Sequence, residues 1–208
     1  MKYFDTLNKQ TNNQVIIDAY EYALKNNVPI ITDDGLLCLL NIIKLTKSKS
    51  ILEVGTAIAY CAMHMADLSD DMHVDTIERK KDMYNIACDN VKKANMENKI
   101  NLIFGDALEV EIEEDKRYDL IFIDAAKSQY IKFFEKYEKH LNPNGIIVSD
   151  NLLFHGLIEN ETAEVGKDLR AMLRKIRRYN DWLKNNDKYD TTFLRIGDGM
   201  AISIKKWK

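Results

Sequence analysis

The sequence predicts a single α/β domain in which a mostly parallel sheet of seven strands is covered by helices on both faces. Strand-like and helix-like patterns alternate along most of the 208 residues, and such alternation builds parallel sheets. The chain ends in two β runs around Gly197-Asp198-Gly199, a spacing that suits an antiparallel hairpin. We therefore expect the hairpin to add an antiparallel edge, and residues 1–49 to form a helical N-terminal extension of the same domain, which spans 1–208.

Each strand in the first half of the chain carries a simple signal. The run 50–55 is apolar and ends in glycine, and 73–78 alternates polar and apolar residues and ends in a carboxylate. A third strand is expected at 100–105, again ending in glycine. Apolar residues at helical spacing predict the helices of this half at 13–25, 34–47, 58–68 and 80–95.

In the second half, the runs YDLIFID at 118–124 and GIIVSD at 145–150 predict two further buried strands. A helix over 129–141 is expected to stop at Asn142-Pro143-Asn144-Gly145, because proline and glycine end helices. A long helix at 165–184 and the hairpin strands at 191–196 and 200–205 complete the predicted fold.

Composition is typical of a globular protein, with 46% hydrophobic and 30% charged residues. No apolar run approaches the ~20 residues of a membrane span, and no apolar segment follows Lys2 as a secretory signal would require. Cys38, Cys61 and Cys88 form no CxxC pair, so we expect buried free thiols in a reducing cytosol. A net charge of −3 argues against a broad nucleic-acid surface. We expect a cytoplasmic protein with no membrane and no DNA partner.

Three features predict a nucleoside cofactor at the carboxyl ends of the strands, where open α/β sheets bind ligands. Gly55 lets the backbone turn tightly ahead of a helix with free N–H groups. Glu78, 23 residues later at the end of the second strand, can accept both hydroxyls of a ribose. Gly105-Asp106-Ala107 follows the third strand and is placed to hydrogen-bond an adenine. Each feature alone also occurs as a helix cap or turn, and the missing second and third glycines of a dinucleotide fingerprint disfavour NAD.

Polar side chains also follow the fourth and fifth strands. Asp124 ends one strand, and Asp150 and Asn151 end the other, so we expect all three around one point. Two carboxylates and an amide oxygen are hard ligands that suit Mg²⁺, Mn²⁺ or Ca²⁺ rather than zinc. Lys127, one turn beyond Asp124, is a candidate base for a metal-bound hydroxyl. The alternative is three unrelated caps and a solvated lysine, but paired carboxylates after buried strands need compensation, which a cation supplies.

Taken together, ILEVGTAIAY, IERK, GDA, FIDAAKSQY and VSDN resemble the metal-dependent O-methyltransferases of the catechol and caffeoyl-CoA type, over roughly Ile30 to the C-terminus. The resemblance implies a Rossmann-like methyltransferase fold that uses S-adenosylmethionine (SAM), with Asp124, Asp150 and Asn151 as metal ligands and Lys127 as the catalytic lysine. It places in the cofactor pocket Glu53, Gly55, Thr56, Tyr60, Glu78, Asp106, Ala107 and Asp124. Ala59 stands where the family usually has glycine, and we expect closer packing there with retained binding.

A narrower resemblance links DNLLFHG, RAMLRKIRRYNDWL and FLRIGDGMAISIKK to bacterial tRNA 5-hydroxyuridine methyltransferases, which make 5-methoxyuridine at the wobble position. It implies a tRNA anticodon stem-loop as partner, with the base swung out to reach the site. The 5-hydroxyl and the neighbouring C4 carbonyl oxygen would chelate a metal as the two oxygens of a catechol do. Relatives of this kind also imply a homodimer, for which the apolar N-terminal helices are a candidate interface.

One further pattern bears on the substrate. Lys167, Arg170, Arg174 and Arg178 fall on one face of the 165–184 helix, opposite an apolar face made by Leu169, Met172, Leu173 and Ile176. Such a basic stripe can contact RNA phosphates, although a solvated helix face is common. A small catechol-like phenol as substrate, and a non-catalytic SAM- or RNA-binding module, remain the alternative readings. The Asp124/Lys127/Asp150/Asn151 set disfavours the last, because a pure binder needs neither the metal nor the lysine.

Overall fold

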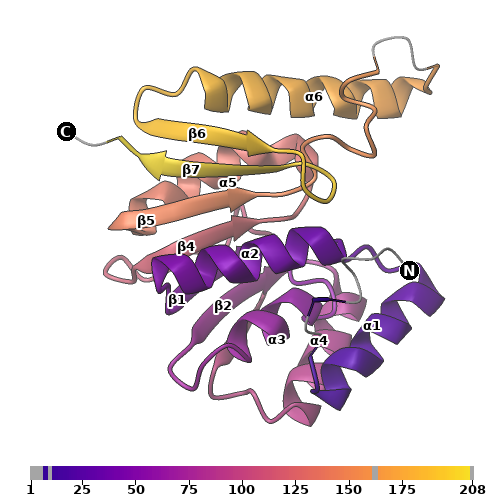
Figure 1. Cartoon of the computed structure of the whole chain (residues 1–208), viewed down its shortest axis with the longest axis vertical. Coiled ribbons are helices and arrows are strands. Elements are labelled where there is room, and N and C mark those ends of the chain that lie inside the picture. Colours follow the sequence, from indigo (N-terminus) through magenta and orange to yellow (C-terminus); the bar gives the residue numbers. More distant parts are fainter. Residues whose placement is uncertain (1–6, 9–10, 161–163, 207–208) are drawn as a thin grey trace.

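The computed structural model describes residues 7–8, 11–160 and 164–206 and confirms the predicted α/β fold (Figure 1). One seven-stranded sheet has the strand order β3-β2-β1-β4-β5-β7-β6. Its parallel strands are β1 (Ser50–Val54), β2 (His73–Glu78), β3 (Ile100–Phe104), β4 (Tyr118–Ile123) and β5 (Leu141–Ser149). The hairpin strands β6 (Tyr189–Leu194) and β7 (Met200–Lys205) form the antiparallel edge.

The helices begin and end close to the predicted positions. They are α1 (Gln14–Asn26), α2 (Asp33–Thr46), α3 (Tyr60–Ala66), α4 (Lys81–Lys93), α5 (Tyr130–Tyr137) and α6 (Lys167–Lys184), with short 3-10 helices η2 (Lys127–Gln129) and η3 (Glu138–His140) on either side of α5. Side-chain oxygens of Asn13 and Thr32 accept backbone N–H groups at the starts of α1 and α2, which fixes where these helices begin.

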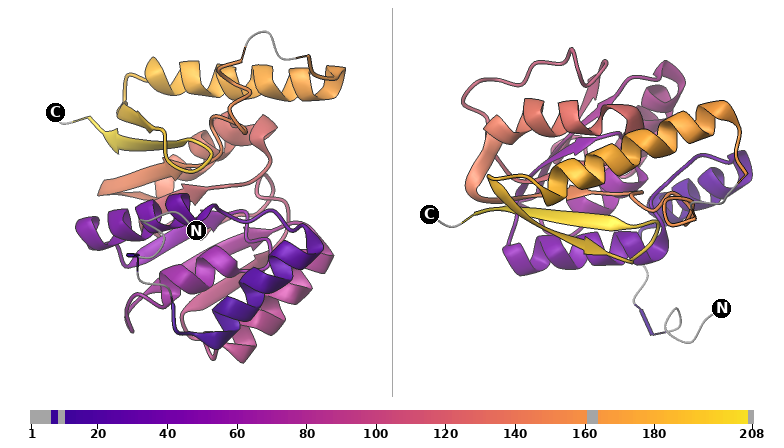
Figure 2. Two further views of the ribbon diagram at one scale, coloured as in Figure 1. Left: turned by 45° about the vertical axis from the view of Figure 1, so that its right-hand side comes forward. Right: turned by 90° about the horizontal axis from the view of Figure 1, so that it is seen from above.

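Two apolar cores lie on opposite faces of the sheet, one under α1 to α4 and the other under α5 and α6 (Figure 2). The central strand β4 feeds both, since Leu120 and Phe122 belong to the first core and Ile121 and Ile123 to the second. A strand buried on both faces has no polar face, which explains the continuous apolar run in the sequence. Because helices cover the two faces of the sheet, the carboxyl ends of the parallel strands are bordered by loops.

The segment around Pro143 differs from the prediction. The expected turn is instead the first part of β5, because Leu141 pairs with Tyr118 and the register then shifts before Leu120 pairs with Ile146. The Asp119 carboxylate accepts a hydrogen bond from Asn142 Nδ2 at 2.8 Å across this irregularity. Proline is tolerated there since it lies at a bulge, where no ladder hydrogen bond is lost.

Two further predictions concern the cysteines and the absence of a membrane-spanning segment. Cys38, Cys61 and Cys88 are free thiols as expected, but only Cys61 is fully buried. None of the helices in the described ranges combines the length and the apolar character that crossing a membrane requires.

Candidate active site

A cavity of about 520 Å³ lies at the carboxyl ends of the parallel strands. It is bordered by the loops after β1, β2, β3, β4 and β5, and by residues 28–32 ahead of α2. All of the predicted cofactor residues line it, together with two of the predicted metal ligands and the predicted catalytic lysine: Glu53, Gly55, Thr56, Tyr60, Glu78, Asp106, Ala107, Asp124, Lys127 and Asn151. The third predicted ligand, Asp150, is fully buried behind this lining. The structure therefore brings the predicted residues together, while their roles stay predictions.

The turn after β1 is held by a close contact with the turn after β4. Gly55 has φ +110°, and a Cβ there would lie 2.1 Å from the Asp124 carbonyl oxygen, so only glycine fits. Ala59, which caps α3, also has left-handed backbone with φ 65°. This conformation would suit the glycine that the family resemblance implies at this position, and the alanine methyl is accommodated in a fully buried position.

Two carboxylates line the cavity at the ends of β2 and β3. Glu78 is buried, and its two oxygens accept the backbone N–H groups of Ala57 at 2.9 Å and Lys80 at 2.7 Å. Asp106 accepts the N–H of Leu108 at 2.9 Å. Each carboxylate oxygen has a second lone pair, so both side chains are fixed by the backbone and can still accept hydrogen bonds from a ligand.

Glu53 is a fully buried carboxyl group at the end of β1. Its Oε2 accepts a hydrogen bond from the Thr76 hydroxyl at 2.5 Å, whereas Oε1 has no hydrogen-bond partner. Burial raises the pKa of Glu53 to about 8, although the Thr76 hydroxyl and the nearby Cys61 thiol lower it in part. An unpartnered buried oxygen that lines a cavity is a site for a donor, and a cationic donor suits it best.

Lys127 connects the side chains at the other end. Its ammonium donates to Asp124 Oδ1 at 2.7 Å and to Asn151 Oδ1. The Asp150 Oδ1 accepts the N–H of Asn151 at 2.7 Å, and Asp150 Oδ2 is buried without a partner. Burial, followed by the charge of Asp124, raises the pKa of Asp150 to about 7. The cluster thus holds two carboxylates against one ammonium, and it has unused acceptor capacity.

These donors fit a hard divalent cation. Asp124, Asp150 and Asn151 offer carboxylate and amide oxygens, and the orphaned Asp150 oxygen gains a partner only from an added cation or donor. Within the described ranges no three His, Cys, Asp or Glu side chains form a metal-binding group. The predicted set has only two carboxylates, and its third member is an amide.

The cavity lining also includes residues that the sequence analysis did not predict, among them Phe154, His155 and Asp198. The first two follow Asp150 and Asn151 closely, so their proximity to the site was available in the sequence. Asp198 reaches the cavity from the β6–β7 turn, and no local pattern marks it.

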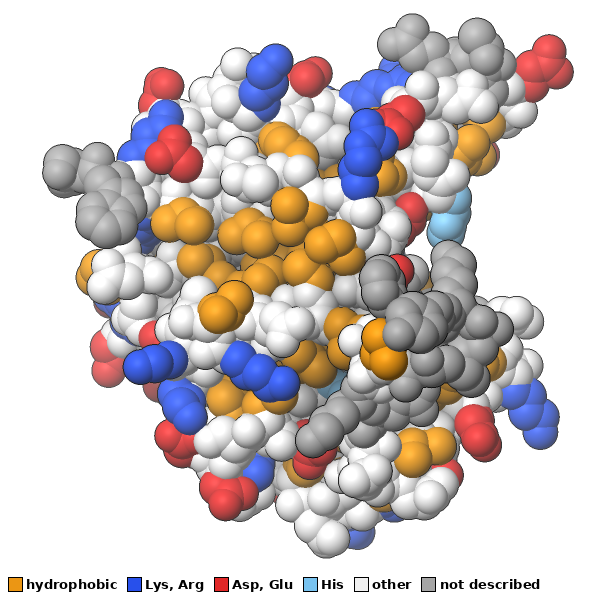
Figure 3. All heavy atoms as spheres, in the orientation of Figure 1, with side chains coloured by type: hydrophobic (Ala, Val, Ile, Leu, Met, Phe, Trp, Pro, Cys, Tyr) orange, Lys and Arg blue, Asp and Glu red, His pale blue; other side chains and the backbone are white. Residues whose placement is uncertain are grey.

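The basic stripe is exposed on α6, as predicted for Lys167, Arg170, Arg174 and Arg178. Lys and Arg side chains occur over this part of the molecule in Figure 3. Of the predicted apolar face, Leu173 and Ile176 are buried, and Leu169 and Met172 are partly buried. Helix α6 packs against η2, the turn that carries Lys127.

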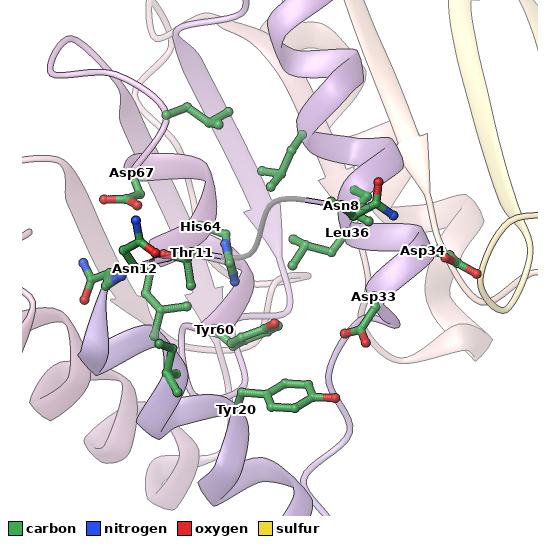
Figure 4. Close-up of a pocket in the computed structure, with 16 residues that line it drawn as sticks. Asn8, Thr11, Asn12, Tyr20, Asp33, Asp34, Leu36, Tyr60, His64 and Asp67 are labelled. Atoms are coloured by element: carbon green, nitrogen blue, oxygen red, sulfur yellow. Dashed lines mark hydrogen bonds between the residues drawn. The ribbon is translucent and has the colours of Figure 1, made fainter. Parts of the chain in front are cut away.

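A second cavity of about 660 Å³ lies between α1, α2 and α3 (Figure 4). It shares Tyr60 with the first, and its lining includes Tyr20, Asp33 and His64. Burial lowers the pKa of His64 to about 4, so this imidazole is neutral. Although it is larger, its lining includes only Tyr60 among the predicted site residues, and the smaller cavity is therefore the candidate active site.

The fold and the cavity define an α/β protein with a ligand site at the carboxyl edge of a parallel sheet. The family model described as O-methyltransferase matches residues 10–206. A caffeoyl-CoA O-methyltransferase from Populus kitakamiensis is 31% identical over 189 residues, which cover 88% of this chain and 80% of the relative. The chain therefore belongs to the O-methyltransferase family.

Solved structures agree with this assignment. A Staphylococcus aureus protein provisionally named a caffeoyl-CoA O-methyltransferase is 41% identical, with a TM-score of 0.90 and coverage of 97% of this chain and 95% of that one. An O-methyltransferase from Bacillus cereus, solved in complex with SAH, shares the fold at 24% identity, with a TM-score of 0.81 and coverage of 97% and 94%.

The raised pKa of Glu53 predicts how stability depends on pH. Because the folded pKa is about 8 and the ordinary value is 4.5, the folded protein keeps a proton that the unfolded chain loses, so stability falls as pH rises between these values. Glu53→Gln stays neutral and removes this loss. Urea unfolding from about pH 5 to about pH 9 should show the variant gaining on the wild type by a few kcal/mol, on the order of the pKa difference. If the stabilities of the two proteins changed with pH in parallel, Glu53 would be ionised in the folded protein, and the prediction would be wrong.

Proposed function

We propose that this protein transfers a methyl group from SAM, with a divalent cation, to the 5-hydroxyl of 5-hydroxyuridine at the wobble position of tRNA. The observation that carries the proposal is one cavity in which Glu78 shares walls with Asp124, Lys127 and Asn151. A nucleoside site and a cluster of hard oxygen ligands at one cavity are what transfer between two bound molecules requires.

The end of the cavity that contains Glu78 and Asp106 supports SAM as the cofactor. Glu78 would accept the ribose hydroxyls and Asp106 the adenine amino group, while the free Oε1 of Glu53 suits the ammonium of the methionine part. When bound, the cofactor supplies a methyl group on a positively charged sulfur. The surrounding carboxylates favour that charge.

The opposite end supports an oxygen acceptor. A divalent cation held by Asp124, Asp150 and Asn151 would lower the pKa of a bound hydroxyl and orient its oxygen. Lys127 Nζ lies within hydrogen-bonding distance of Asp124 and Asn151, and as the neutral amine it would be placed to receive the proton that the hydroxyl loses. The reaction would form one O–CH₃ bond and break one S–CH₃ bond, while the hydroxyl proton passes to the neutral amine of Lys127 and leaves it as the ammonium.

The choice of tRNA rests on the likeness of the sequence motifs and on the position of the basic stripe. Lys167, Arg170, Arg174 and Arg178 are exposed on a helix that packs against the Lys127 turn. Phosphates bound along that helix would bring a flipped base close to the cavity. The stripe is local, so it is compatible with the net charge of −3.

A small phenol is the second candidate, because the P. kitakamiensis relative is a caffeoyl-CoA O-methyltransferase. Nucleoside analysis of tRNA from cells that lack the gene separates the two. The proposal predicts loss of 5-methoxyuridine and accumulation of 5-hydroxyuridine. Unchanged 5-methoxyuridine would point to the phenol.

Metal dependence is tested at Asp150. Asp150→Ala, and Asp150→Asn with its conserved size, should lower turnover by about 100-fold or more, since one charged ligand is lost. The Kd for SAM should stay within a few fold, because Asp150 lies behind the far end of the cavity. Isothermal calorimetry and methyl transfer with and without EDTA measure both. Full turnover in excess EDTA would contradict a metal-dependent reaction.

The basic stripe is tested with the double variant Arg170→Ala/Arg174→Ala. Each lost phosphate contact weakens RNA binding and lowers the slope of binding against salt by about one unit. The KM for hydroxylated tRNA should rise strongly while the KM for SAM and the rate with a small catechol change little. The matched control is Lys92→Ala/Lys93→Ala, which removes two exposed charges from α4. If both double variants had the same KM for tRNA at several salt concentrations, the basic stripe would be only a solvated helix face.

A further inference from the structure

The loop that follows β5 forms one wall of the candidate active site. Phe154 and His155 line the cavity together with Lys127 and Asn151. Their ring centroids lie 5.2 Å apart, and the His155 side chain is 79% exposed at the rim. An aromatic ring and an imidazole beside the oxygen ligands suit a flat, polar acceptor ring.

The backbone of this wall has a conformation that its residues disfavour. Asn151, Phe154 and His155 have φ values of 61°, 45° and 54°. Residues other than glycine avoid this left-handed region, Phe154 more strongly than Asn151 or His155, so neighbouring groups must hold the loop in place.

Asp198 is the neighbour that holds it. It lies in the β6–β7 turn and is 8% exposed. Its Oδ1 accepts the backbone N–H of His155, and its Oδ2 lies 3.7 Å from the His155 Nδ1. Its backbone carbonyl accepts the N–H of Leu153 at 2.8 Å, and the next carbonyl, of Gly199, accepts that of Leu152 at 2.9 Å. The carboxylate thus fastens the loop at His155, which lies within the left-handed run of Phe154, His155 and Gly156.

We propose that Asp198 is a positioning residue that fixes the Phe154–His155 wall and thereby determines which acceptor rings the enzyme binds. This inference rests on the proposed methyl transfer and adds a specificity determinant to the same site. Asp198 acts through the loop and need not touch the acceptor.

The kinetic test compares Asp198→Ala, Asp198→Asn and the control Asp190→Ala, an exposed carboxylate on β6. Asp198→Ala should raise the acceptor KM by about tenfold or more, the expected effect of a lost hydrogen bond to a charged group. Its kcat and its Kd for SAM should change by less than about threefold. Asp198→Asn should behave nearly as the wild type, because an amide oxygen still accepts the His155 N–H. The assay uses two acceptors, which are catechol and a tRNA that contains 5-hydroxyuridine.

A wild-type acceptor KM in Asp198→Ala, or an equal defect in Asp198→Asn, would overturn the inference. If Asp198→Ala does not fold, Asp198→Ser serves instead, since its short side chain leaves the His155 N–H out of reach. Hydrogen exchange of the peptide covering 151–157 is read without substrate. It should be faster than wild type in Asp198→Ala and unchanged in Asp198→Asn and Asp190→Ala. Unchanged hydrogen exchange in Asp198→Ala would reject the inference. Failure of the tRNA proposal would be a different result, namely a wild-type enzyme that does not methylate the RNA.

Discussion

The close approach of the loops after β1 and β4 is the constraint on which the site depends. These strands are parallel neighbours, and the N–H of Asp124 donates to the Val54 carbonyl at 3.0 Å as the strands end. Only a glycine at position 55 allows this contact, because any Cβ would collide with the Asp124 carbonyl. Gly55, in the turn after β1, and Asp124, the first of the predicted metal ligands, therefore touch through their backbones. Two ligands bound on either side of that contact would meet without any movement of the domain.

Electrostatics then explain why this cavity favours cations. Glu53 and Asp150 are both buried, and burial is the largest cause of the raised pKa of each. Near Asp150 the Lys127 ammonium supplies one positive charge, but it is already shared between Asp124 and Asn151. Each orphaned carboxyl oxygen destabilises the ligand-free protein and is relieved when a cation or donor arrives. In the proposed reaction, the same arrangement would add affinity for a positively charged cofactor and for a metal ion.

The sequence predicted those parts of the site that a strand end determines. Glu78 ends β2, and the other site residues lie one or two positions beyond the strands β1, β3, β4 and β5: Gly55, Asp106, Asp124 and Asn151. Parallel strands bring such residues to one edge of the sheet. The predicted start of β5 at Gly145 was wrong. The strand begins at Leu141, because the pairing of Leu141 with Tyr118 across a bulge outweighs the turn signal of Pro143.

What the sequence could not supply are contacts between distant segments. The hydrogen bond from the His155 N–H to Asp198 spans 43 residues and follows no periodicity. The left-handed backbone of Ala59 is likewise set by the surrounding packing, against the preference of alanine. The resemblance to tRNA-modifying enzymes gave a substrate, and that substrate stays a prediction.

Helix α6 joins the surface to the site more directly than its exposed charges suggest. On its inner side, Asn180 Nδ2 donates to the Leu152 carbonyl at 3.3 Å, and the Arg177 guanidinium donates to the Ile158 carbonyl at 2.8 Å. The Tyr179 hydroxyl lies 2.7 Å from Ser149 Oγ at the end of β5. Arg177 is thus a structural residue within a basic helix, and the charges left for phosphates are those that face outward. Because one rigid helix carries both the outward stripe and the contacts to the loop after β5, a macromolecule seated on the stripe would be placed relative to the same wall that receives its reacting ring.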